Sequence, residues 1–91
     1  MVEQKLFDTY YAITQEALEV ARKAPIQEQD KAEEVFDMVE RYLSDAQYFA
    51  KNNDRTRGFA AINYAHGWLD CAARMKIFLV DDNRLFTEDG S

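Results

Sequence analysis

The sequence predicts an all-α protein, folded as a single three-helix up-and-down bundle over residues 1–91. Apolar residues recur at three- and four-residue spacings in three separate stretches, as they do in amphipathic helices. Only three glycines and one proline interrupt the 91 residues. The connections between the three stretches are short, which makes consecutive helices antiparallel. A chain of this length has material for one hydrophobic core, so we expect one domain.

The first helix is expected at about residues 3–24, and its apolar positions form two neighbouring stripes. It ends near Pro25, because proline lacks the backbone donor that a helix needs. The second helix is expected at about 30–51, where acidic residues near its start suit the helix dipole. Polar, turn-forming residues follow, and a third helix is expected at about 55–79 with a tail over 80–91.

The third helix is apolar around most of its circumference, which predicts contact with both other helices. We expect Cys71 to lie in this apolar arc, where a thiol stays protonated and behaves as a small hydrophobic group. Glycine inside a helix costs about 1 kcal/mol relative to alanine, so we expect another helix or a ligand to approach Gly67 closely. The remaining face of this helix is polar and carries Asn63, His66, Gly67, Asp70 and Arg74.

The chain is acidic, with 17 Asp and Glu against 11 Lys and Arg and a net charge of −6. This charge repels a phosphate backbone, so nucleic-acid binding is not expected despite the basic cluster of Lys51, Arg55 and Arg57. The acidic second helix attracts a basic partner or keeps the protein soluble. With a single cysteine, no secretory signal and no membrane-spanning apolar run, a cytoplasmic protein without membrane contact is expected.

The chain carries more apolar surface than a three-helix core requires. A homodimer interface would bury this surplus, and so would a covering by Leu85 and Phe86 from the tail. The leading hypothesis is therefore a non-enzymatic interaction module that binds itself or a protein partner. The candidate interface residues are Phe7, Tyr11 and Leu18 on the first helix and Phe59 and Ile77 on the third.

The alternative hypothesis is a small-ligand or metal site, possibly catalytic, centred on His66 and Asp70, which are adjacent on one helical face. Structural roles explain the same residues, because His66 can satisfy a neighbouring acceptor and Asp70 can pair with Arg74. No ExxH, HxxxH or HExxH motif occurs, and we assign no cofactor, metal ligand or catalytic residue. The candidate ligand-binding residues are Asn63, His66, Asp70 and Arg74 on the third helix and Asp45 and Tyr48 on the second.

Two segments carry a resemblance to a known family: Tyr-Leu-Ser-Asp-Ala-Gln-Tyr-Phe at 42–49 and Asn-Tyr-Ala-His-Gly-Trp-Leu-Asp-Cys-Ala-Ala-Arg at 63–74. They resemble an archaeal family of short proteins known as domain-of-unknown-function family 357, over nearly the whole chain. The resemblance implies a left-twisted three-helix bundle of the immunoglobulin/albumin-binding-domain type in an intracellular protein. It implies no activity and no catalytic residue. The family commonly has Gly-Asp before its last helix, where this chain has Asn53-Asp54.

Overall fold

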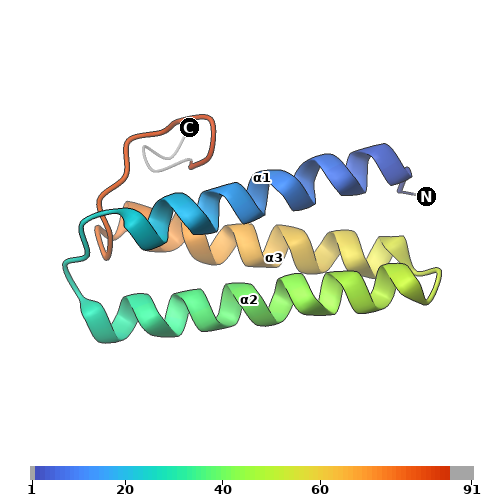
Figure 1. Cartoon of the computed structure of the whole chain (residues 1–91), viewed down its shortest axis with the longest axis horizontal. Helices are drawn as coiled ribbons and strands as arrows, with labels where there is room; N and C mark the ends of the chain where they lie inside the picture. Colours follow the sequence, from blue (N-terminus) through green and yellow to red (C-terminus); the bar gives the residue numbers. More distant parts are fainter. Residues whose placement is uncertain (1, 87–91) are drawn as a thin grey trace.

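The structure, a computed structural model, describes residues 2–86, and three α-helices account for most of them. They are α1 (Gln4–Lys23), α2 (Gln29–Lys51) and α3 (Arg55–Arg74). Each helix runs opposite to the one before it, and α3 lies between α1 and α2 in the view of Figure 1. The expected all-α, three-helix bundle is confirmed.

The centre of the bundle is α3, which packs on both other helices, most extensively on α2, whereas α1 and α2 touch each other little. Its buried face is rich in alanine, and small side chains allow helices to approach closely. The tightest approach is at Gly58. A Cβ atom there would lie 2.8 Å from Cε2 of Phe7 on α1 and 2.9 Å from the carbonyl oxygen of Ala46 on α2.

The third helix ends at Arg74 rather than near residue 79, which corrects the expected range. Its end is closed by two hydrogen bonds, from the Lys76 amide to the Ala73 carbonyl and from the Ile77 amide to the Ala72 carbonyl. Lys76 adopts a left-handed conformation with φ 61°, so the chain turns out of the helix there. Apolar periodicity continues beyond this turn and masked the end of the helix in the sequence.

The segment after α3 runs back over the bundle and belongs to the core. Phe78 forms an isolated bridge with Ile26 and stacks against Phe36 with ring centroids 5.8 Å apart. Leu85 and Phe86 are each 1% exposed, and the Phe86 ring meets the Phe78 ring edge-on. The expected covering by Leu85 and Phe86 from the tail is therefore present in the fold. The rest of the expected tail, 87–91, lies outside the described residues.

Three of the five candidate interface residues are core residues, which corrects the expectation that they form leftover surface. Phe7 is 5% exposed, and Leu18 and Ile77 are each 6% exposed. Tyr11 and Phe59 are half-buried at the edge of the core, and burial raises the pKa of the Tyr11 phenol while a hydrogen bond with Gln47 opposes this. Sequence periodicity identified apolar stripes but not the helix that covers each of them.

Candidate functional site

A pocket of about 430 Å³ lies between α1, α3 and the segment that follows α3. It brings together Asn63, His66 and Asp70, three of the six residues predicted to bind a ligand. Backbone geometry explains this grouping, because residues three and four apart share one face of a helix. The pocket is lined by Tyr10, Ile13, Thr14, Asn63, His66, Gly67, Asp70 and Arg84.

His66 connects three parts of the chain through its ring nitrogens. Nε2 lies 2.7 Å from the Leu85 carbonyl oxygen, and Nδ1 lies 2.9 Å from Oγ1 of Thr14 on α1. A carbonyl only accepts, so Nε2 carries a proton and donates to Leu85. In the neutral ring, the Thr14 hydroxyl then donates to Nδ1. Oδ1 of Asp70 is 3.6 Å from Nε2, and both side chains are partly exposed.

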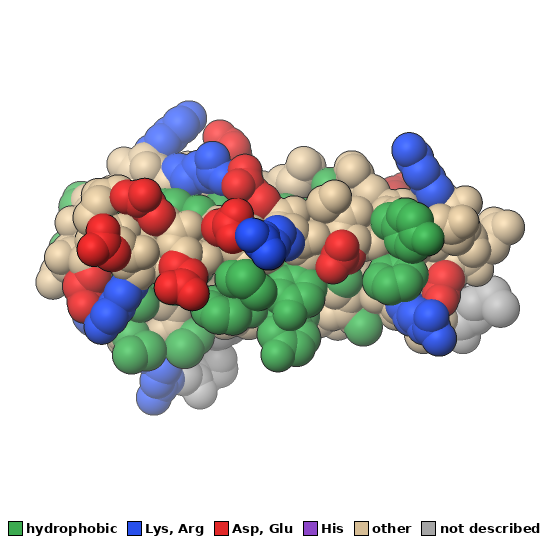
Figure 2. Space-filling view, turned by 90° about the horizontal axis from the view of Figure 1, so that it is seen from below, with side chains coloured by type: hydrophobic (Ala, Val, Ile, Leu, Met, Phe, Trp, Pro, Cys, Tyr) green, Lys and Arg blue, Asp and Glu red, His purple; other side chains and the backbone are tan. Residues whose placement is uncertain are grey.

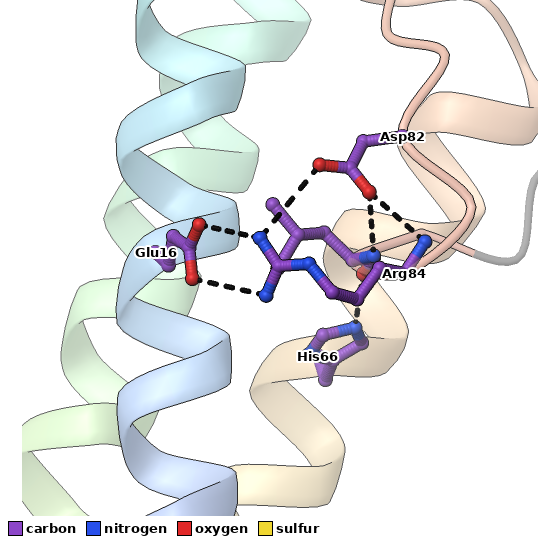
Figure 3. A network of polar contacts seen from close by, with 5 residues as sticks. Glu16, His66, Asp82 and Arg84 are labelled. Atoms are coloured by element: carbon purple, nitrogen blue, oxygen red, sulfur yellow. Dashed lines mark hydrogen bonds and ion pairs between the residues drawn. The ribbon is translucent and has the colours of Figure 1, made fainter.

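Arg84 fixes the same segment to α1 (Figure 3). Its guanidinium donates two hydrogen bonds to the Glu16 carboxylate, at 3.2 and 2.6 Å. The hydrogen bond from Arg84 lowers the pKa of Glu16 below its ordinary value. Asp82 shapes the turn by accepting hydrogen bonds from the backbone amides of Arg84 and Leu85 at 2.9 and 3.3 Å. The polar groups in and around the pocket thus hold the segment after α3, residues 75–86, in place; we call it the C-terminal segment.

Asp45 and Tyr48 do not join this pocket, which corrects their predicted grouping with His66. Both are exposed on α2, and Asp45 borders a different, shallow hollow that Tyr42 and Tyr64 also line. The polar stripe of α3 faces α1 and the C-terminal segment instead. Arg74 is exposed at the last turn of α3 and is not among the residues lining the pocket.

Two further expectations concern the exposed side of α3. Cys71 lies in the apolar arc beside Trp68 and Met75 as expected, with its Sγ 3.8 Å from Sδ of Met75, but it is exposed, which corrects the expected burial of this arc. Nothing lies within 4 Å of where a Cβ atom of Gly67 would stand, so no neighbouring helix requires this glycine. Within this chain, the close approach of helices occurs at Gly58. The indole nitrogen of Trp68 is buried and has no hydrogen-bond partner among residues 2–86.

Two of the three residues in the basic cluster, Arg55 and Arg57, have structural roles. Arg55 donates to the Val2 carbonyl at 3.0 Å and to Oε1 of Gln4 at 2.9 Å, tying the start of α3 to the start of the chain. Asp54 caps α3 by accepting from the Arg57 amide, and the Arg57 side chain lies 3.4 Å from the same carboxylate. Lys51 is exposed at the end of α2.

Sequence reasoning missed the residues that other segments bring to the site, namely Thr14, Glu16, Asp82 and Arg84. Buried Thr14 sits within an apolar stripe of α1, a signal that could have marked it as the partner of a polar group. The approach of Arg84 depends on the path of the tail, which no periodicity reveals. Within the described part of the chain, no three His, Cys, Asp or Glu side chains converge as a metal ion requires, and no helix is long and apolar enough to span a bilayer.

Comparison with known proteins identifies one family. The model of the family described as "Protein of unknown function (DUF357)" matches residues 9–78, which include most of α1 and all of α2 and α3. The match ends before Arg84, which lines the pocket, and before Leu85, whose carbonyl oxygen accepts a hydrogen bond from His66. Neither a curated protein nor a solved structure matches the chain. The family match, together with the three-helix fold, shows that this chain is a member of the DUF357 family.

Proposed function

We propose that this protein is a non-enzymatic interaction module that associates with a second copy of itself through the outward face of α3. The observation that carries the proposal is the lack of charge on this face. Every exposed residue between Gly58 and Arg74 is uncharged. Outward positions of a surface helix are ordinarily charged or polar. We call this surface the α3 face and define it by its uncharged residues Ala60, Tyr64, Gly67, Trp68, Cys71 and Met75.

Large side chains, two of them aromatic, give the α3 face its apolar area. Tyr64 and Met75 are each 61% exposed. The Tyr64 ring stacks on the ring of Tyr42 with centroids 4.7 Å apart, which extends the face onto α2. Tyr64, Gly67, Trp68 and Cys71 line a shallow, open hollow. Tyrosine, tryptophan and methionine are the side chains enriched where proteins bind one another.

The other faces of the bundle differ in charge. Figure 2, seen from the side of α2, shows acidic and basic side chains spread over the surface, with a group of hydrophobic side chains near the middle. Two molecules that each carry a net charge of −6 repel one another, and a charge-free face allows the closest approach. The polar pocket also supports a non-enzymatic role, because His66 and Arg84 are engaged in holding the C-terminal segment.

Sedimentation velocity across a wide concentration range tests the proposal. We expect the wild-type chain to form dimers and Gly67→Arg to remain monomeric, because the variant places a long charged side chain in the middle of the α3 face. The fold accommodates this change, since nothing lies within 4 Å of the Gly67 Cβ position. The matched control is Ala12→Arg on the exposed side of α1, which should dimerise normally. A wild-type monomer at all concentrations, or dimers of Gly67→Arg, would overturn the proposal.

A second candidate function is binding of a small polar ligand in the pocket between α1 and α3. It is favoured by the pocket's size and by its donors and acceptors, to which Asn63 contributes an exposed amide. A ligand that binds the folded state raises the melting temperature by mass action. We expect any stabilising compound from a panel of small carboxylates and phosphates to lose its effect with Asn63→Ala. Unchanged melting across the panel would argue against this function.

A further inference from the structure

The α3 face has a symmetry that fits a partner running in the opposite direction. Its larger side chains, Tyr64, Trp68, Cys71 and Met75, follow one another at spacings of four, three and four residues. Alternation of three and four is the spacing of a helix–helix seam. Reversing the helix about the point midway between Trp68 and Cys71 brings Tyr64 onto Met75 and Trp68 onto Cys71. One stripe therefore meets a reversed copy of itself position by position.

Side-chain size favours the reversed copy over a parallel one. In an antiparallel pair, the bulky Trp68 faces the small Cys71, and Tyr64 faces the flexible thioether of Met75. Facing large and small side chains interdigitate, and sulfur–aromatic contacts are favourable. In a parallel pair, Trp68 would face Trp68 while Cys71 would leave a gap opposite Cys71. Gly67 lies beside the stripe without a side chain, which lets a second helix come close.

Charge at the two ends of the stripe favours the same direction. Exposed Arg74 and Lys76 lie at the end next to Met75, whereas the hollow next to Tyr64 is bordered by both Asp45 and Arg57, whose opposite charges offset each other. Antiparallel packing keeps Arg74 and Lys76 of one copy away from those of the other and brings them to the Asp45 and Arg57 end, where the two charges offset each other. Parallel packing sets cation against cation. Antiparallel helices also place opposite ends of their dipoles side by side.

We infer that two copies of this chain pair antiparallel along α3, about a two-fold axis that passes midway between Trp68 and Cys71. The inference rests on the proposed self-association and specifies its direction and register. Such an axis makes the contact isologous, so that each residue pair occurs twice. The Tyr64 and Met75 positions of different copies are directly opposed. The two Met75 positions lie about 16 Å apart along the direction of the paired helices, at a rise of 1.5 Å per residue.

Disulfide trapping with copper phenanthroline tests the direction, because a disulfide forms only between Cα atoms closer than about 7 Å. The chains are Tyr64→Cys and Met75→Cys, each carrying Cys71→Ser and distinguished by tags of different mass. We expect the mixture to give a cross-linked heterodimer several-fold more abundant than cross-linked dimers of either chain alone. The wild-type chain, with Cys71 close to the axis, is the positive control and should cross-link to itself. Sedimentation of both variants before oxidation verifies that they still dimerise.

The outcomes separate this inference from the proposed function. Efficient cross-linking of each variant with itself would show parallel pairing, which overturns the inference and leaves self-association through α3 intact. A dimer by sedimentation in which neither the wild-type chain nor the mixture cross-links would place the contact elsewhere and overturn both. A wild-type monomer at every concentration would overturn the proposed function itself.

Discussion

Individual residues at the helix ends decide where the helices stop. Asn53 after α2 and Lys76 after α3 both have positive φ, 60° and 61°. Each lies in a turn whose two backbone hydrogen bonds satisfy the last carbonyls of its helix. Asparagine tolerates this conformation, but lysine does so at a cost. The end of α3 therefore carries backbone strain that glycine would relieve.

Lys76→Gly should stabilise the protein by up to about 1 kcal/mol, because glycine adopts a positive φ without steric cost. The expected rise in melting temperature is about 4 °C or more for a gain of 1 kcal/mol in a domain of this size. Lys76→Ala removes the same exposed side chain and serves as the control, with no gain expected. Thermal unfolding followed by circular dichroism measures both. A loss of stability with glycine would contradict the strain argument.

The Glu16–Arg84 contact makes the attachment of the C-terminal segment dependent on pH. The Arg84 hydrogen bond lowers the pKa of Glu16 from its ordinary value of 4.5. A carboxyl with a lowered folded-state pKa stabilises the fold above its unfolded pKa and loses that contribution as pH falls through the folded value. We therefore expect the contact to be intact at neutral pH and to weaken below about pH 4.5. Carboxyl NMR titration should show the pKa of Glu16 returning toward 4.5 in Arg84→Gln.

At the scale of elements, two close fits hold the bundle together. Gly58 lets α3 approach both α1 and α2, since Phe7 and the Ala46 backbone fill the space of a Cβ atom. The segment after α3 then covers one end of the core with Leu85 and Phe86, each 1% exposed. The family match ends at residue 78, so part of this core lies beyond the matched region.

Gly58→Ala should destabilise the protein by about 1–3 kcal/mol, because the new methyl group would overlap a backbone carbonyl that cannot move independently. Gly67→Ala is the matched control on the same helix. It should stabilise the monomer by about 1 kcal/mol, since alanine is the better helix former and the position is open. Urea unfolding at concentrations low enough to keep the chain monomeric measures both. Equal effects of the two substitutions would contradict the close fit at Gly58.

Leu85→Ala should cost about 2–5 kcal/mol, as expected for a buried leucine in a hydrophobic core. Leu79→Ala in the same segment is the control and should stay within about 0.5 kcal/mol, because Leu79 is exposed. Denaturant unfolding compares the two variants. If Leu85→Ala were as mild as Leu79→Ala, the segment would not be part of the cooperative core.

At the scale of the whole molecule, charge opposes the proposed association while the α3 face favours it. The repulsion between two chains of net charge −6 acts over long distances and is screened by salt, whereas apolar contact is not. We therefore expect the dimer to become tighter as ionic strength rises from about 0.01 M to 0.15 M, as the Debye length falls from about 30 to 8 Å. Sedimentation equilibrium at several salt concentrations measures this. Dissociation by salt would indicate a contact held by ion pairs instead.

The sequence by itself determined the all-α class, the three helices and the membership of His66, Asn63 and Asp70 in one polar stripe. These features follow from local rules, because helix periodicity places residues three and four apart on one face. The family resemblance carried by residues 42–49 and 63–74 is likewise a property of the sequence and is confirmed by the family match.

Only the tertiary structure decided what each face of a helix meets. It placed α1 and the tail, rather than Asp45 and Tyr48 of α2, against the polar stripe of α3. It buried Phe7 and Leu18 and exposed Cys71. The physical reason is that periodicity fixes directions around one helix, whereas the neighbour in each direction depends on how all the segments share a single core.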